Sequence, residues 1–110
     1  MARVLLGEFA ALVRAGLLSL LAEERAQVVQ AADQDVPARV AQGRPDVVVL
    51  DLDGGHVGAL ARYLCERYPA VTVVACSSSR PAMRVFPPFH HGESYTRPLD
   101  PEALRALVRG

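Results

Sequence analysis

The sequence contains no lysine, so all twelve of its basic residues are arginine, and they are balanced by twelve acidic residues. Domains that bind nucleic acid usually carry an excess of positive charge, and the formal net charge of zero provides none. Any contact with DNA would therefore need a C-terminal or other domain outside residues 1–110. A site that normally uses lysine would have to use the planar guanidinium of arginine instead.

Long apolar runs are also absent. No stretch approaches the roughly 18 to 20 apolar residues that cross a bilayer. The apolar residues at the start of the chain are interrupted by Gly7 and Glu8, which is too early for a signal peptide. We therefore expect a cytoplasmic protein without a membrane partner.

Few residues suggest covalent or metal chemistry. Cys65 and Cys76 do not have metal-type spacing, and we expect two buried free thiols. The side chains of adjacent residues point apart, so His90 and His91 predict a surface loop more than a metal or phosphohistidine site. Phosphate-binding glycine loops and nucleophile-elbow motifs are missing. The sequence does not predict an enzyme.

Strand-like and helix-like patterns alternate along the chain, which has the length of one domain, residues 1–110. The predicted strands are 3–6, 26–31, 47–50, 71–76 and 94–96, and the predicted helices are 10–21, 33–42, 57–68 and 101–108. Residues 80–93 are predicted to be irregular, because Pro81, Pro87 and Pro88 interrupt any long helix. This alternation predicts an α/β domain with a doubly wound five-stranded parallel sheet and helices on both faces.

Polar side chains follow four of these predicted strands. Glu8 follows the first strand, Asp51 ends the third, Ser77 ends the fourth and Arg97 follows the fifth. In an open parallel sheet, sites form at the carboxyl ends of the strands. Two acids, a hydroxyl and a cation meeting there could bind a divalent ion and a phosphoryl group.

Four parts of the chain, in the same order, carry a family resemblance: residues 3–6 together with 12–17, residues 44–52 with Asp51 near their end, Ser77, and residues 95–104. They resemble the receiver domains of bacterial response regulators of the NarL/FixJ type, and the resemblance covers almost the whole chain. It implies a flavodoxin-like (βα)5 receiver fold with strand order 2-1-3-4-5. It also implies that Asp51 is equivalent to the phosphoacceptor, Ser77 and Arg97 contact the phosphate, and Tyr95 is the switch aromatic.

The metal site implied by the resemblance is altered. The family places two adjacent acids after the first strand to hold magnesium, and this chain has Glu8 and Phe9 there. The remaining ligands would be Glu8, Asp51 and Asp53. Because Mg²⁺ requires near-octahedral oxygen ligands, the loss of one carboxylate predicts weak or lost metal binding.

Two further departures concern the switch region. Arg97 replaces the family's lysine, and we expect it to lie near Asp51. The fourth helix of the family cannot be continuous here because of Pro87 and Pro88. Phe86 and Phe89 around these prolines either form an exposed dimer or ligand surface or pack onto the core.

Two functions follow from these features. The first is an atypical, phosphorylation-independent receiver in a two-component system or in transcriptional regulation, acting as a homodimerisation module that senses a ligand or partner. The alternative is a conventional phosphoacceptor receiver, phosphorylated on Asp51 by a histidine kinase with Mg²⁺ bound. In either case the chain could be part of a longer regulator or a stand-alone receiver.

Overall fold

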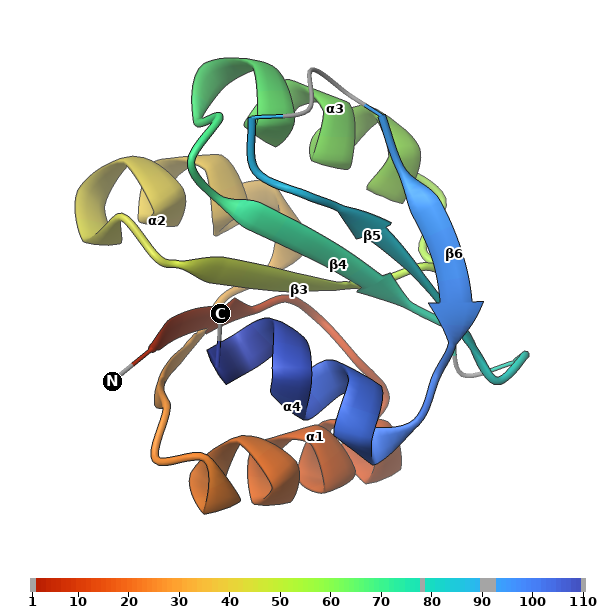
Figure 1. Ribbon diagram of the computed structural model, residues 1–110. Coiled ribbons are helices and arrows are strands. Elements are labelled where there is room, and N and C mark those ends of the chain that lie inside the picture. Colours follow the sequence, from red (N-terminus) through yellow and green to blue (C-terminus); the bar gives the residue numbers. More distant parts are fainter. Residues whose placement is uncertain (1, 78, 90–92, 110) are drawn as a thin grey trace.

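The computed structural model describes residues 2–77, 79–89 and 93–109. These residues form a mixed six-stranded sheet with helices on both faces (Figure 1). In chain order the elements are β1 (Arg3–Leu6), α1 (Ala11–Glu23), β2 (Gln27–Gln30), the 3-10 helix η1 (Asp33–Asp35), α2 (Val36–Gly43), β3 (Val47–Asp51), α3 (Val57–Arg67), β4 (Thr72–Cys76), β5 (Ala82–Phe86), β6 (Tyr95–Pro98) and α4 (Pro101–Arg109). Within these ranges, no helix has both the length and the apolar character to cross a membrane.

The first four strands form a parallel unit in the order β2-β1-β3-β4. The β-branched run Val47–Val49 lies in β3 and is buried on both faces of the sheet, as its composition predicts. Helices connect these strands, because a parallel pair needs a crossover connection. The predicted order of these four strands is confirmed.

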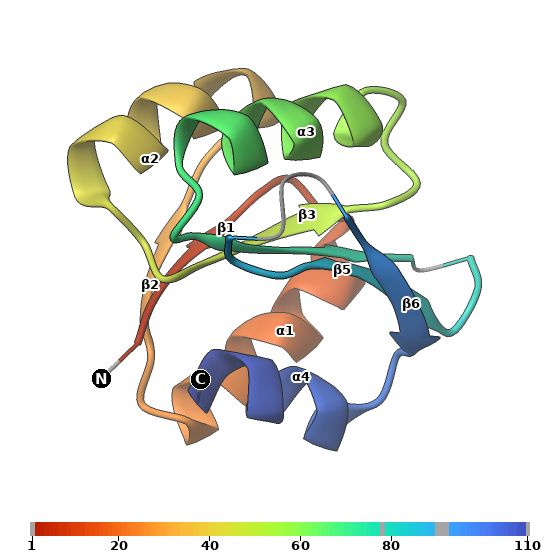
Figure 2. The same cartoon turned by 45° about the horizontal axis from the view of Figure 1, so that its top comes forward.

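Helices α2 and α3 cover one face of the sheet, and α1 and α4 cover the other (Figure 2). Each face has its own hydrophobic core. The core on the α1/α4 side is centred on Leu6, Leu21, Val49, Met83 and Leu104. The core on the α2/α3 side is centred on Leu5, Val36, Leu50, Leu64 and Val73.

The prediction of five parallel strands is wrong. Residues 82–86, predicted to be irregular, form β5, which pairs antiparallel with β4 and with β6. Within β5, Met83 and Val85 are buried and Arg84 between them is exposed, which is the alternation of a strand. The flanking Pro81 and Pro87 limit β5 and do not interrupt it. Only residues 77–81 connect β4 to β5, too few for the crossover that a parallel pair requires.

The aromatic pair next to the prolines is divided between core and surface. Phe86 is buried on the α2/α3 side, whereas Phe89 is 66% exposed and has a positive φ of 62°. Neither expectation for the pair as a whole is therefore confirmed. The paired histidines at 90 and 91 lie outside the described residues.

Two smaller predictions are confirmed. Pro101 begins α4, and Asp100 caps it, because its Oδ1 accepts a hydrogen bond of 2.8 Å from the Glu102 amide. Cys65 and Cys76 are both free and buried. Burial and the charge of Asp51 raise the pKa of the Cys76 thiol to about 12, so this thiol stays protonated at neutral pH and is a poor nucleophile.

Candidate functional site

The carboxyl ends of β1, β3 and β4 meet at one edge of the sheet, as the sequence predicts for a parallel arrangement. Asp51 is the last residue of β3, half-buried, and is registered with Cys76 at the end of β4. Ser77 follows directly and is 5% exposed, which makes it the one buried polar residue among those the structure describes. This edge is the candidate functional site.

Asp51 closes a tight turn after β3. Its Oδ1 accepts a hydrogen bond of 2.9 Å from the Asp53 amide, and the Gly54 amide donates to the Asp51 carbonyl at 3.0 Å. An aspartate side chain that accepts from the amide two residues later is an Asx-turn. The turn directs the chain across the end of β4 and brings Asp53 to the loop that follows that strand.

The Asp53 carboxylate binds the serines of the β4–β5 loop. Its Oδ1 accepts hydrogen bonds from the hydroxyls of Ser77 at 2.9 Å and Ser79 at 3.0 Å, and its Oδ2 accepts from the Ser79 amide at 3.1 Å. The Ser77 hydroxyl also accepts a hydrogen bond of 3.1 Å from the Arg80 amide. The only hydrogen of this hydroxyl is thus already donated, and one of its lone pairs is occupied.

A second acidic pair lies where β1 and β2 end. The Glu8 amide donates to Oδ1 of Asp33 at 3.2 Å, and the Asp33 amide donates to Oε1 of Glu8 at 3.3 Å. Gly7 makes this approach possible, because a Cβ atom there would lie 2.9 Å from Oδ1 of Asp33. Each carboxylate is therefore held by the backbone of the other residue.

Asp33 was not among the predicted site residues. It lies three residues after β2, so it reaches the same edge of the sheet as the other acids. A Cβ atom on Gly54 would lie 3.8 Å from Oδ2 of Asp33, which places this carboxylate beside the turn that follows Asp51. The signal in the sequence was the position of Asp33 after a parallel strand, where Glu8 and Asp51 also occur.

The predicted magnesium ligands Glu8, Asp51 and Asp53 are divided between these two networks. Glu8 exchanges hydrogen bonds with Asp33, whereas Asp53 binds the serine loop. Among the residues that the structure describes, no group of three acidic, histidine or cysteine side chains is arranged to hold a metal. Phe9, which replaces the family's second acid, is buried in the core under α1 and α4. Magnesium binding stays a prediction.

The expectation that Arg97 lies near Asp51 is wrong. The register of the sheet places Asp51 opposite Cys76, Cys76 opposite Met83, and Met83 opposite Arg97. Arg97 is therefore three strands from Asp51, and strands lie about 4.8 Å apart, so their Cα atoms are about 14 Å apart. The insertion of β5 between β4 and β6 causes this displacement.

Tyr95, predicted as the switch aromatic, lies at the start of β6 and is registered with Val85. It is 41% exposed, and every residue of β6 is exposed. The tyrosine is also three strands from β3, because β6 is the edge strand of the sheet that the described residues form. Among the predicted phosphate and switch residues, Ser77 lies beside Asp51, whereas Tyr95 lines a hollow next to Ser77 and Arg97 lies farther along the same edge.

A hollow of about 440 Å³ lies beside this edge. It is lined by Asp53, Ser77, Arg80, Arg84 and Thr96 together with four neighbouring residues. Arg84 donates from Nε to the Ser94 hydroxyl at 2.8 Å, and its guanidinium lies 5.4 Å from the centroid of the Phe86 ring. These contacts hold Arg84 at the wall of the hollow.

Comparison with known proteins identifies no relative of this chain. No protein-family model matches it, and neither a curated protein nor a solved structure does. The resemblance to receiver domains therefore depends on the residues of this chain alone.

Proposed function

We propose that this chain is an atypical, receiver-like binding module of bacterial signalling that works without phosphorylation of Asp51. It is not an enzyme in this proposal, and it would act in a two-component system or in transcriptional regulation, with any DNA contact made by another segment or partner. The proposal keeps the resemblance of the segments around Asp51 and Ser77. It does not keep the family's five-stranded parallel sheet.

The observation that carries the proposal is the occupied hydroxyl of Ser77. In the family that the chain resembles, this hydroxyl would meet the oxygens of a phosphoryl group on Asp51. Here the Asp53 carboxylate accepts the hydrogen bond instead, at 2.9 Å. The two serines and the Ser79 amide already surround an anion that belongs to the chain itself.

Charge supports the same conclusion. A phosphoryl group on Asp51 would add negative charge to a turn that contains Asp53 and has the Asp33 carboxylate beside it. Two like charges 4 Å apart repel by about 1 kcal/mol even in bulk water, and by more near a protein surface. Among the described residues, no arginine forms an ion pair or hydrogen bond with Asp51, and Arg97 is three strands away.

The test is exposure of the whole chain to acetyl phosphate and MgCl₂, followed by intact mass measurement. We expect no phosphoryl adduct on the wild-type chain at donor concentrations that label a conventional receiver measured in parallel. An adduct that disappears in Asp51→Asn would contradict the proposal and support the alternative of a conventional phosphoacceptor. The Asp53→Ala variant removes the competing carboxylate, and we expect its labelling to equal or exceed that of the wild type.

A binding module also needs a partner, and a second copy of the chain is the partner we propose. In the part of the chain that the structure describes, the outer side of β6 has no neighbouring strand, and all four of its residues are exposed. Free strand edges of this kind pair readily with another strand.

Tyr95→Lys tests this homodimer, because a lysine on an edge strand disfavours strand pairing. Tyr63→Lys on α3 is the matched control, since Tyr63 is 42% exposed and Tyr95 is 41% exposed. We expect sedimentation velocity to show dimers for the wild type and the control, and monomers for Tyr95→Lys. Monomers in all three proteins would exclude the homodimer.

A further inference from the structure

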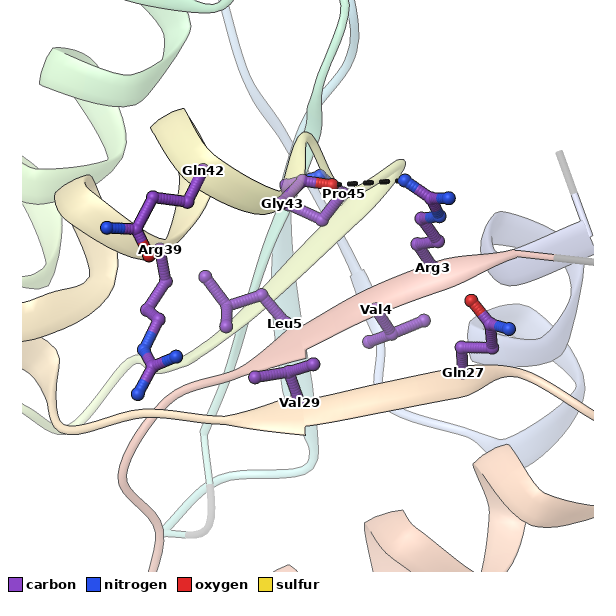
Figure 3. A pocket seen from close by; sticks show the side chains of 9 residues that line it. All are labelled: Arg3, Val4, Leu5, Gln27, Val29, Arg39, Gln42, Gly43 and Pro45. Carbon is purple, nitrogen blue, oxygen red and sulfur yellow. Dashed lines mark hydrogen bonds between the residues drawn. The ribbon is translucent and has the colours of Figure 1, made fainter.

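A second hollow, of about 310 Å³, lies at the opposite end of the strands from Asp51. It opens between α2 and the first residues of β1 and β2 (Figure 3). Its lining residues are Arg3, Val4, Leu5, Gln27, Val29, Arg39, Gln42, Gly43 and Pro45. Its volume lies at the lower limit of small-molecule pockets, which begin at about 300 Å³.

The floor of the hollow is apolar. Leu5 and Val29 are directly opposite each other in the parallel pair of β1 and β2, so they lie on the same face of the sheet. Leu5 is buried, but Val29 is 50% exposed because β2 is an edge strand and α2 does not cover it fully. An exposed branched side chain beside a buried one provides a surface for the apolar part of a ligand.

The rim of the hollow is polar and basic. Arg39 and Gln42 are three residues apart on α2 and therefore share one side of the helix. Figure 3 shows Arg39 extending from α2 towards Val29 of β2. Across the hollow, Arg3 and Gln27 are registered with each other at the start of β1 and β2.

The two arginines have no acidic partner in the lining. No aspartate or glutamate is among the lining residues. Arg3 donates from Nη1 to the Gly43 carbonyl at 3.4 Å, and among the described residues the Arg39 guanidinium forms no ion pair or hydrogen bond. Arg105 and Arg109, by contrast, are paired with Glu23 at the end of α1 and with Glu24 directly after it. Asp46, whose Oδ2 accepts a hydrogen bond of 2.9 Å from the Arg3 amide, lies close to Arg3, so within the part of the chain that the structure describes the unpaired positive charge of the hollow is that of Arg39.

We propose that this hollow binds a small organic acid with an apolar body, its carboxylate on Arg39 and its apolar part on Val29 and Leu5. Guanidinium groups bind carboxylates through two parallel hydrogen bonds, which fixes the orientation of the ligand. The amides of Gln27 and Gln42 can donate to further oxygens of the ligand. This inference does not depend on the proposed function, because the hollow and the Asp51 edge lie at opposite ends of the strands.

The probes are benzoate, its neutral counterpart benzamide, and acetate, which has the charge without the ring. Each is titrated into the ¹⁵N-labelled chain while amide shifts are recorded. We expect benzoate to cause saturable shifts confined to residues 3–5, 27–29 and 39–43. Benzamide and acetate should bind at least about tenfold more weakly, the loss expected when a charge-assisted hydrogen bond or the apolar contact is removed.

Two variants and one control complete the test. Arg39→Gln should weaken benzoate binding about tenfold, whereas Arg62→Gln on the exposed side of α3 should leave it unchanged. Val29→Thr keeps the shape and strand preference of the residue, and should weaken benzoate about threefold. Equal affinity for benzoate and benzamide, equal effects of the two arginine variants, or shifts that do not saturate would each overturn the inference.

Discussion

The two halves of the sheet differ in how helices cover them. In the parallel half, β2-β1-β3-β4, α2 and α3 lie over one face and α1 and α4 over the other (Figure 2). In the antiparallel extension, β5 and β6, Met83 and Val85 face the α1/α4 core, while Arg84 on the other face is exposed. In the parallel half, β1, β3 and β4 are buried on both faces, whereas burial decreases across the extension, from the buried Met83, Val85 and Phe86 of β5 to β6, whose residues are all exposed.

One row of the sheet makes this difference measurable. Leu50, Ala75, Arg84 and Thr96 are successive partners in the register and therefore lie on the same face. Leu50 is 1% exposed under α2 and α3, whereas Thr96 at the other end of the row is exposed. Truncation to alanine at each end of the row therefore compares a buried with an exposed position of the same face.

The largest effect is expected for Leu50→Ala. It removes buried methyl groups and leaves a cavity, which typically costs about 2–5 kcal/mol in the free energy of unfolding. Thr96→Ala should change this free energy by less than about 0.5 kcal/mol, because the side chain is exposed. Urea denaturation of both variants gives the comparison, and similar losses for the two would show that the halves are equally buried.

Gly7→Ala should have the next largest effect, at the edge that carries the acids. The added Cβ would lie 2.9 Å from Oδ1 of Asp33 and 3.1 Å from Cδ2 of Leu50, and we expect a loss of about 1–3 kcal/mol from this crowding. Gly16→Ala is the control, since a Cβ there meets no atom within 4 Å and lies inside α1. It should stabilise the chain by up to about 1 kcal/mol. Thermal unfolding measures the stability of both variants. An unchanged stability of Gly7→Ala would show that the contact between Glu8 and Asp33 is loose enough to accommodate a methyl group.

The smallest effect concerns the ion pairs that attach α4 to α1. The carboxylate of Glu24 accepts hydrogen bonds from Arg109 at 2.7 and 3.1 Å. These bonds, with the charges of Arg109 and Arg105, lower the pKa of Glu24 from 4.5 although partial burial opposes them. Its stabilising effect is therefore present above pH 4.5 and is lost as pH falls through the lowered value.

Glu24→Gln tests this pH dependence. Its neutral amide does not titrate, so its stability should fall less steeply than that of the wild type as the pH drops below 4.5. The measurement is urea denaturation at a series of acidic pH values. Parallel curves for the two proteins would mean that the Glu24 pair does not contribute to acid sensitivity.

The parallel half could be predicted from the sequence because its signals are local. The run Val47–Val49 is β-branched and continuous, and crossover lengths between the strands favour helices. Because these strands are parallel, their carboxyl ends share one edge of the sheet, so the position of Asp51 and Ser77 at that edge was predicted correctly. The turn by which Asp53 reaches the serine loop was not predictable, because it depends on side-chain hydrogen bonds across 24 residues.

The extension was mispredicted because prolines were interpreted as breaks and not as boundaries. Pro81 and Pro87 leave five residues between them, which is enough for one strand. The alternation of Met83, Arg84 and Val85 was present in the sequence. Missing β5 also misplaced Arg97, since a residue on the sixth strand cannot reach the third.

The inserted β5 also has a consequence for the path of the chain. Two antiparallel reversals restore the original heading, so β6 points in the same direction as β4 and the polypeptide leaves both strands at the same rim. From there α4 can return across the sheet beside α1, where Leu104 and Val108 complete the core (Figure 1). A single extra strand would have delivered the last helix to the far rim, so the hairpin widens the sheet without rerouting the C-terminus.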